Sequence, residues 1–300
     1  MIVGAIDLGS NTVKITIAEV GADLKVLFEA AEITRIGEGL DASGVLKAGA
    51  MDRTYRCLEG YVERCRTLGA ERIRCVATAG MRGAQNGAEF LARAKAGLGL
   101  DIEIIHGLRE AELAFAAPAQ LYGPGPVLVI DVGGRSTELV YGTSGRLVSR
   151  VSLEIGGVRM TERFLPSDPP RPAELLACRQ FLEEVYRDAP AAEGAALVGV
   201  SGTVMALYGR AVGEPEMAKV VAQGEGAWLS RAQVEQQLAE LAALPAQQRL
   251  YGSVIPPGRH DVIVAGALVT LVAMERYGAE RMRVSNRGVR YGLLFELARA

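Results

Sequence analysis

The same short pattern occurs twice in this chain of 300 residues. Each copy is an apolar run, then Asp-x-Gly followed by small polar residues, then a second apolar run; the copies are residues 2–15 and 127–140. Apolar runs on both sides of a glycine turn predict two neighbouring strands joined by a tight loop. Because the pattern recurs in both halves, we expect a duplicated domain with one such loop in each copy.

The two loops carry groups that bind phosphate. Glycine lets backbone N–H groups approach a ligand closely, and successive N–H groups that point one way form a nest for an anion. Asp7 and Asp131 would repel a phosphate, so we expect them to hold a hydrated divalent cation or to orient a water molecule. The alternative is a plain β-hairpin in which Asp and Gly only serve the turn. Four hydroxyl side chains add donors: Ser10, Thr12, Ser136 and Thr137.

Length and composition fit about two globular domains. With 49% hydrophobic residues, 23% charged residues and a net charge of −2, nothing indicates binding to nucleic acid or to an anionic membrane through bulk charge. No charged segment precedes an apolar stretch at the N-terminus, and the longest apolar helix candidate, 262–274, is too short to span a bilayer. The four cysteines form no Cys-x-x-Cys pair. We therefore expect a cytoplasmic protein.

The first half alternates predicted strands and helices. Asn86 with Glu89 three residues later resembles a capping box that opens a helix ending near Gly97. A further helix is expected to begin near Leu108. The other expected elements of this half are strands at 2–6, 13–20, 73–77 and 102–105 and a helix at 47–68.

Residues 118–126 are rich in Pro and Gly, break both helix and strand, and make the best domain boundary. We therefore expect domains at 1–120 and 121–300, with the last helix able to pack back on the first domain. In the second half, a Pro-rich surface stretch at 166–172 precedes a strand at 197–200. A parallel-rich α/β sheet in each half, with the ligand between the halves, is the architecture that this order favours.

Three further segments have chemical content. Residues 201–203 follow a strand and open a helix, which suits an anion at the helix N-terminus or a simple capped turn. Arg287 and Arg290 flank a glycine turn, either as a phosphate clamp or as a solvated turn. Glu110 and Glu112 lie in the first turn of a helix, where they either complement the helix dipole or direct a carboxylate at a water molecule.

The chain resembles the exopolyphosphatase and guanosine pentaphosphate phosphatase family, within the sugar kinase, actin and Hsp70 superfamily. The resemblance runs essentially end to end. The motifs that carry it are residues 7–12, 32–40, 77–82, 131–139, 257–262 and 285–288.

The resemblance implies an α/β fold of two ribonuclease-H-like (actin-like ATPase) domains flanking an interdomain cleft. It further implies that water attacks the terminal phosphoryl group of inorganic polyphosphate or guanosine pentaphosphate (pppGpp), assisted by Mg²⁺ or Mn²⁺. Glu110 matches the family's general base and Glu138 its second essential carboxylate. Asp7, Asp131 and Glu138 would bind or orient hydrated metal. A homodimer is a family-level expectation, and the chain matches a short form that lacks an appended helical domain.

Together, the loops and the resemblance define one set of candidate phosphate-binding residues. These are Gly9, Ser10, Asn11, Thr12, Arg82, Gly133, Gly134, Arg135, Ser136, Thr137, Ser201, Gly202, Thr203 and Arg287.

Two positions depart from the family pattern. Arg135 replaces a glycine of the phosphate loop, where it either clamps phosphate or obstructs the loop. Around Glu110, the flanking residues Arg109 and Glu112 change sign relative to the usual Glu-Glu-Glu-Ala-Arg. The favoured function is hydrolysis of terminal phosphate from polyphosphate. The alternatives are the same chemistry on pppGpp, a superfamily kinase or ATPase with an adenosine pocket around residues 201–203, and a sensor that binds without turnover.

Overall fold

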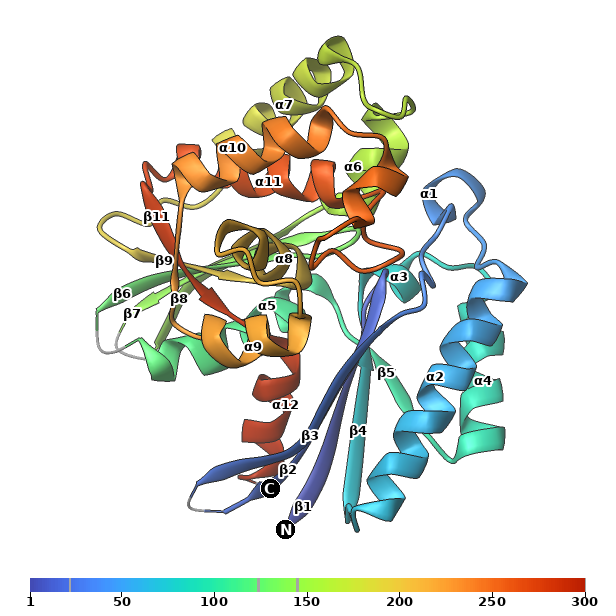
Figure 1. Cartoon of the computed structure of the whole chain (residues 1–300). Helices are drawn as coiled ribbons and strands as arrows, with labels where there is room; N and C mark the ends of the chain where they lie inside the picture. Colours follow the sequence, from blue (N-terminus) through green and yellow to red (C-terminus); the bar gives the residue numbers. More distant parts are fainter. Residues whose placement is uncertain (22, 123–124, 144–145, 300) are drawn as a thin grey trace. The chain divides into compact units, whose positions relative to one another are not determined.

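The computed structural model describes residues 1–21, 23–122, 125–143 and 146–299 (Figure 1). Two compact units are present: Met1–Ala116 together with the chain from Val289 onward, and Ala117–Gly288. Each unit is built on one sheet. Within the described residues, no helix combines the length and the apolar character that crossing a bilayer requires.

The sheet of the first unit has the order β3-β2-β1-β4-β5. β1 (Ile2–Leu8), β2 (Thr12–Val20) and β3 (Leu24–Ile33) form an antiparallel meander, because only three residues separate each strand from the next. β4 (Arg72–Ala77) and β5 (Ile102–Ile104) run parallel to β1, because helical crossovers precede them. The predicted strands of this half are confirmed, and β3 was not predicted.

Within the described residues of the first unit, six helices contribute to its structure. Their bounds are α1 (Leu40–Ser43), α2 (Ala48–Thr67), α3 (Ala79–Arg82), α4 (Gly87–Leu98), the start of α5 (Gly107–Leu121) and α12 (Val289–Leu297). The core cluster is formed by the sheet together with α1 to α4 and includes Ile6, Leu8, Ile15, Leu58 and Phe90.

The sheet of the second unit has the order β10-β11-β9-β6-β7-β8. β6 (Pro126–Val132), β7 (Thr137–Thr143) and β8 (Arg146–Leu153) form an antiparallel meander. β9 (Ala196–Val200) is parallel to β6, and β11 (Arg281–Ser285) is parallel to β9. Read from β8, the order repeats that of the first unit, and β10 (Trp228–Ser230) is an added edge strand. The duplication predicted from the loops therefore extends to strand connectivity.

Helices cover this second sheet around a large apolar core. The most buried of them is α11 (Ile263–Arg276), whose residues from Ile263 to Met274 are all buried. The other helices described in this unit include α6 (Gly157–Phe164), α7 (Pro172–Arg187), α8 (Gly202–Ala211), α9 (Met217–Gly224), α10 (Arg231–Ala242) and the 3-10 helix η1 (Ala246–Leu250).

Two local predictions were wrong. The Asn86 side chain does not cap α4; its amide instead bonds the backbone N–H and C=O of Leu46 at 2.8 and 3.1 Å. The helix α5 does not stop before Pro118 but continues through it to Leu121, because a single proline removes only one backbone hydrogen bond and the next turn still forms. Residues 123–124 of the predicted breaking segment lie outside the described residues.

The packing of α12 on α5 depends on Gly292. A Cβ atom at this position would lie 2.3 Å from the carbonyl oxygen of Leu113. We expect Gly292→Ala to lower the free energy of unfolding by about 1–3 kcal/mol, because backbone rather than a flexible side chain must move. Gly60→Ala in α2 is the matched control: nothing lies within 4 Å of its Cβ, so it should stabilise by about 0.5–1 kcal/mol. Urea denaturation measures both, and equal effects would contradict the packing argument.

Candidate active site

The parallel strands of the first unit end at one edge of their sheet. Leu8 pairs with Ala77, and Ala77 pairs with Ile104, so the ends of β1, β4 and β5 lie in one line. Ligands of open α/β sheets bind at the carboxyl ends of parallel strands. The loop after β1, the helix α3 after β4 and the start of α5 after β5 therefore gather there. They carry three groups of predicted site residues: the loop 9–12, Arg82 and Glu110.

Glu110 and Arg82 form an ion pair at this edge. The two side chains meet at 2.8 Å, and Arg82 also donates to the carbonyl oxygen of Ile105 at 3.1 Å. Glu110 is only 7% exposed. An ion pair with little solvent fixes the direction of the carboxylate, which is what a group that must accept a proton from one particular water requires.

The reversed charges around Glu110 form a network of their own. Arg109 pairs with Glu112 at 3.1 Å, one turn along α5, and also with Glu296 on α12. Glu296 in turn pairs with Arg74 of β4 at 3.0 Å. The substituted residues therefore connect α5 to α12 and, through Glu296, to β4.

The loop after β1 is held through its backbone. The N–H of Gly9 donates to the carbonyl of Thr12 at 3.1 Å, and the carbonyl of Ser10 accepts from Gly37 at 2.9 Å. A Cβ on Gly80 would lie 2.8 Å from the Cα of Ser10, so α3 can approach the loop only because residue 80 is glycine. The predictions included neither Gly37 nor Gly80 as site residues, although both lie in motifs that carry the resemblance.

Arg35 adopts a backbone conformation that favours glycine. Its φ is 56°, and its N–H and that of Thr34 donate to the carbonyl of Asn11 at 3.0 and 3.1 Å. A non-glycine residue in the left-handed region costs about 1–2 kcal/mol. The loop therefore depends on a strained neighbour, a feature that occurs at functional sites.

Asp7 is buried and faces a cation across the hairpin. In the register of β1 and β2 it lies opposite Lys14. Burial raises the pKa of the Asp7 carboxyl, and the charges of Lys14 and Arg290 oppose that rise. Arg290 is itself held inside the first unit, where it donates to the carbonyl of Ile15 and pairs with Glu29 at 3.3 Å. The turn at 285–292 therefore offers Arg287 rather than two arginines for phosphate.

The second unit repeats this arrangement. Asp131 pairs with Val200, and Val200 pairs with Ser285, so the ends of β6, β9 and β11 lie in one line. The segments that follow these strands are 133–136, 201–203 and 286–288 (Figure 1). The three parts of the predicted phosphate site that belong to the second half of the chain are therefore brought to one edge of the sheet.

The loop after β6 copies the loop after β1. Gly133 N–H donates to the carbonyl of Ser136 at 3.0 Å. The first turn of α6 binds the loop's own carbonyls: Gly157 donates to Gly133 at 3.0 Å and Val158 to Gly134 at 2.7 Å. A Cβ on Gly156 would lie 2.5 Å from the carbonyl carbon of Gly134. Sequence reasoning missed Gly156, and the Gly-Gly pair at the start of α6 was the available signal.

Asp131 and Glu138 form a pair of carboxylates on one face of the sheet. They are directly opposite each other on β6 and β7 and are 8% and 1% exposed. Ser152 on β8 donates to Glu138 Oε1 at 2.7 Å. Like charges directly opposite each other destabilise a sheet. Aligned on Asp7 and Asp131, Glu138 falls where the first unit has Lys14, so the first unit has an internal cation where the second has a second anion.

This pair fits a hard divalent cation. Carboxylate oxygens are the ligands that Mg²⁺ prefers, and Mg²⁺ commonly binds through one or two carboxylates while water and substrate phosphate complete its shell. Among the residues that the structure describes, no group of three or more Asp, Glu, His or Cys side chains is placed to hold a metal.

Arg135 is buried beside α6. Its guanidinium lies 3.9 Å from Glu162. Burial, together with the nearby charge of Arg159, lowers the pKa of Arg135 to about 10 against the opposing effect of Glu162. This arginine therefore has a partner on the helix that supports the loop.

The side chains of the turn at 201–203 make hydrogen bonds within the protein. The Ser201 hydroxyl caps α8 by accepting from the N–H of Val204 at 3.1 Å. A Cβ on Gly202 would lie 2.4 Å from a guanidinium nitrogen of Arg259, and Arg259 contacts the Thr203 hydroxyl at 3.4 Å. Burial lowers the pKa of Arg259 to about 10. Arg259, in the motif 257–262, is a half-buried cation at this edge that was not among the predicted site residues.

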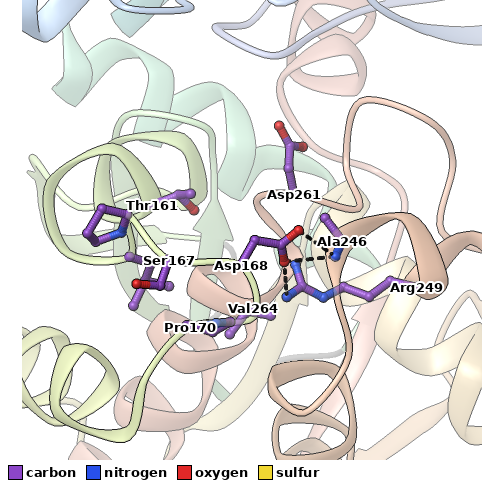
Figure 2. Close-up of a pocket in the computed structure, with 10 residues that line it drawn as sticks. Thr161, Ser167, Asp168, Pro170, Ala246, Arg249, Asp261 and Val264 are labelled. Atoms are coloured by element: carbon purple, nitrogen blue, oxygen red, sulfur yellow. Dashed lines mark hydrogen bonds and ion pairs between the residues drawn. The ribbon is translucent and has the colours of Figure 1, made fainter.

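A separate pocket lies between α6, η1 and the start of α11. Figure 2 shows Asp168 in contact with the guanidinium of Arg249 and the N–H of Ala246. Arg249 also donates to the carbonyl of His260 at 2.9 Å, which ties the Pro-rich stretch to the loop before α11. The pocket has a volume of about 150 Å³ and contains none of the predicted site residues; its lining is Thr161, Leu165, Pro166, Ser167, Asp168, Pro170, Ala246, Arg249, Asp261 and Val264.

Comparison with known proteins gives one consistent result. The model of the Ppx/GppA phosphatase family matches residues 15–300. Exopolyphosphatase 2 of Mycobacterium tuberculosis is 34% identical over 316 aligned residues, which cover 99% of this chain and 98% of that protein. The crystal structure of the Aquifex aeolicus member of the Ppx/GppA protein family is 31% identical, with a TM-score of 0.82 over 100% of this chain and 98% of that one. The crystal structure of an exopolyphosphatase-like protein is 29% identical, with a TM-score of 0.92 over 99% and 98%. The predicted α/β fold of two ribonuclease-H-like (actin-like ATPase) units is confirmed.

Proposed function

Because the chain belongs to the Ppx/GppA phosphatase family, we propose that it is an exopolyphosphatase that removes the terminal phosphate from inorganic polyphosphate. Water attacks the terminal phosphorus, the bond from that phosphorus to the bridging oxygen breaks, and inorganic phosphate and a chain one unit shorter leave. Phosphoryl transfer of this kind needs mostly positioning and charge neutralisation.

Glu110 is the general base in this proposal. It accepts the proton of the attacking water, and its contact of 2.8 Å with Arg82 supports a fixed carboxylate. Arg82 contributes positive charge for the phosphate.

Asp131 and Glu138 hold the divalent cation, which we take to be Mg²⁺ or Mn²⁺. When bound, such an ion neutralises charge on the phosphate oxygens and on the leaving oxygen. The carboxylate pair, opposite each other on β6 and β7 beside a glycine loop, is the observation that carries the proposal. Asp7 orients water or hydrated metal from the loop after β1.

The loops bind the phosphate groups. Backbone N–H groups and hydroxyls of residues 9–12 and 133–137 form the cradle, and Arg287 adds a cation. Residues 201–203 contribute backbone N–H groups at the start of α8, where a helix N-terminus favours an anion. A cytoplasmic location and a homodimer belong to the same proposal.

The experiment that tests the function measures phosphate release from long-chain polyphosphate, tripolyphosphate and pppGpp in parallel. We expect release that needs Mg²⁺ or Mn²⁺, stops with EDTA, and has its highest kcat/KM on polyphosphate. A higher kcat/KM on pppGpp would assign the enzyme to the guanosine nucleotide. Binding without release from any of the three would replace the enzyme by a sensor.

A further inference from the structure

The turn after β11 adjoins the carboxylate of Asp131. Ser285 is in register with Val200, which is in register with Asp131. Three residues further along, a Cβ on Gly288 would lie 3.0 Å from Val200 Cγ1 and 3.5 Å from Asp131 Oδ2. The backbone of residues 285–288 is therefore packed close to a proposed metal ligand, and the same turn carries Arg287.

One acidic side chain holds this turn. Oε1 of Glu225 accepts from the hydroxyls of Tyr122 and Ser285 at 2.9 and 2.8 Å. Its Oε2 accepts from the N–H of Asn286 at 3.0 Å and lies 4.0 Å from Nε of Arg287. Both carboxylate oxygens are therefore engaged, and three of the four contacts are with the turn.

The backbone that follows Glu225 is hydrogen-bonded to β11, next to the turn at 285–288. Gly226 donates to the carbonyl of Val284 at 2.8 Å, and Val284 donates to Ala227 at 2.9 Å. The Ser285 hydroxyl, which donates to Glu225, accepts from the N–H of Arg287 at 3.1 Å. The carboxylate is thus fixed on one side to β11 and linked through a single hydroxyl to the arginine's own backbone.

The charge of Glu225 needs an explanation. Its side chain is 25% exposed, at the edge proposed to bind a polyanion, where a carboxylate by itself repels the ligand. Hydrogen bonds to an ionised acceptor are about twice as strong as neutral ones. A neutral amide could accept from the two hydroxyls, but it could not also accept from the Asn286 N–H and attract Arg287 with full charge.

We propose that Glu225 is a positioning residue of the phosphate site: it fixes the turn at 285–288 so that Arg287 is held ready for the substrate. Glu225 does not touch the reacting atoms and acts through Arg287. The inference rests on the proposed function for the identity of the substrate, and it goes beyond that function by assigning a role to a residue outside the phosphate loops.

The test compares Glu225→Gln with the wild type on tripolyphosphate. We expect KM to rise about tenfold, the equivalent of one charge-assisted hydrogen bond, while kcat changes less than twofold. Tyr122→Phe is the matched control. It removes one donor to Glu225 and a longer bond to the Val284 carbonyl, at 3.3 Å, but leaves the charge of Glu225 and its contacts with Ser285, Asn286 and Arg287. Its KM should stay within twofold. Ser285→Ala cuts the link to the Arg287 backbone, should raise KM in the same way, and replaces Glu225→Gln if that variant does not fold.

A double-mutant cycle separates positioning from general stability. In an Arg287→Ala background, Glu225→Gln should add less than twofold to KM, because the residue through which it acts is gone. A full tenfold loss in that background, or an unchanged KM in the single variant, overturns the inference. The dissociation constant of tripolyphosphate, measured by calorimetry on the same variants, tests it even if the wild type releases no phosphate and the proposed function fails; wild type that binds no tripolyphosphate overturns both.

Discussion

Replacing Glu110 by Gln is expected to lower kcat on polyphosphate by about 10²–10⁴-fold, the range that general-base catalysis contributes. The amide keeps the size of the side chain and can still accept from Arg82, so the buried contact is not left empty. It cannot accept the proton of the attacking water. Phosphate release under saturating substrate and metal measures the effect, and calorimetry with tripolyphosphate should give a dissociation constant within a few-fold of the wild type.

Glu112→Gln is the control for this substitution. Glu112 lies on the same helix, two residues further along, and forms an ion pair with Arg109. Its removal takes one contact from the network that supports α5 but leaves the ion pair of Glu110 with Arg82. We expect less than a threefold change in kcat. Near-normal turnover by Glu110→Gln would remove the mechanism, and an equal loss in both variants would mean that α5 had been disturbed.

The duplicated loops were predictable because their information is local. A glycine turn between two apolar runs specifies a hairpin wherever it occurs, and both hairpins form with the same contact, from Gly9 to Thr12 and from Gly133 to Ser136. The strands β4, β5 and β9 were predicted by the same kind of pattern. Because the carboxyl ends of parallel strands lie at the same edge of a sheet, the segments that follow these strands lie together at that edge.

The partners of the site residues were not predictable, because they depend on register and on the packing of distant segments. Nothing local says that Lys14 lies opposite Asp7 while Glu138 lies opposite Asp131; that follows from the pairing of each hairpin. The dependence of the second loop on Gly156 arises from a helix that begins about twenty residues later. The predicted capping box at Asn86 was wrong for the same reason: the side-chain amide of Asn86 bonds the backbone of Leu46, which is distant in sequence.

Glu138→Gln is expected to cause the second large loss of activity, because it removes one of the two carboxylates proposed to bind the metal ion. With Asp131 kept, the variant has one carboxylate where the wild type has two, so it should bind a divalent cation more weakly. A catalytic metal contributes several kcal/mol of charge stabilisation, so we expect kcat/KM to fall by about 10²–10³-fold at fixed metal. The Mn²⁺ dissociation constant, followed by electron paramagnetic resonance, should rise in parallel.

Two further variants decide whether the charge of Glu138 or its packing matters. Ser152→Ala removes the hydroxyl that donates to Glu138 Oε1 at 2.7 Å and keeps the charge of Glu138. We expect an intermediate loss of kcat/KM, because mutation of a residue that hydrogen-bonds a metal ligand lowers metal affinity or activity by about 10–100-fold. Glu235→Gln, on the exposed side of α10, should be neutral. If Glu138→Gln binds Mn²⁺ as tightly as the wild type, Glu138 is not a metal ligand.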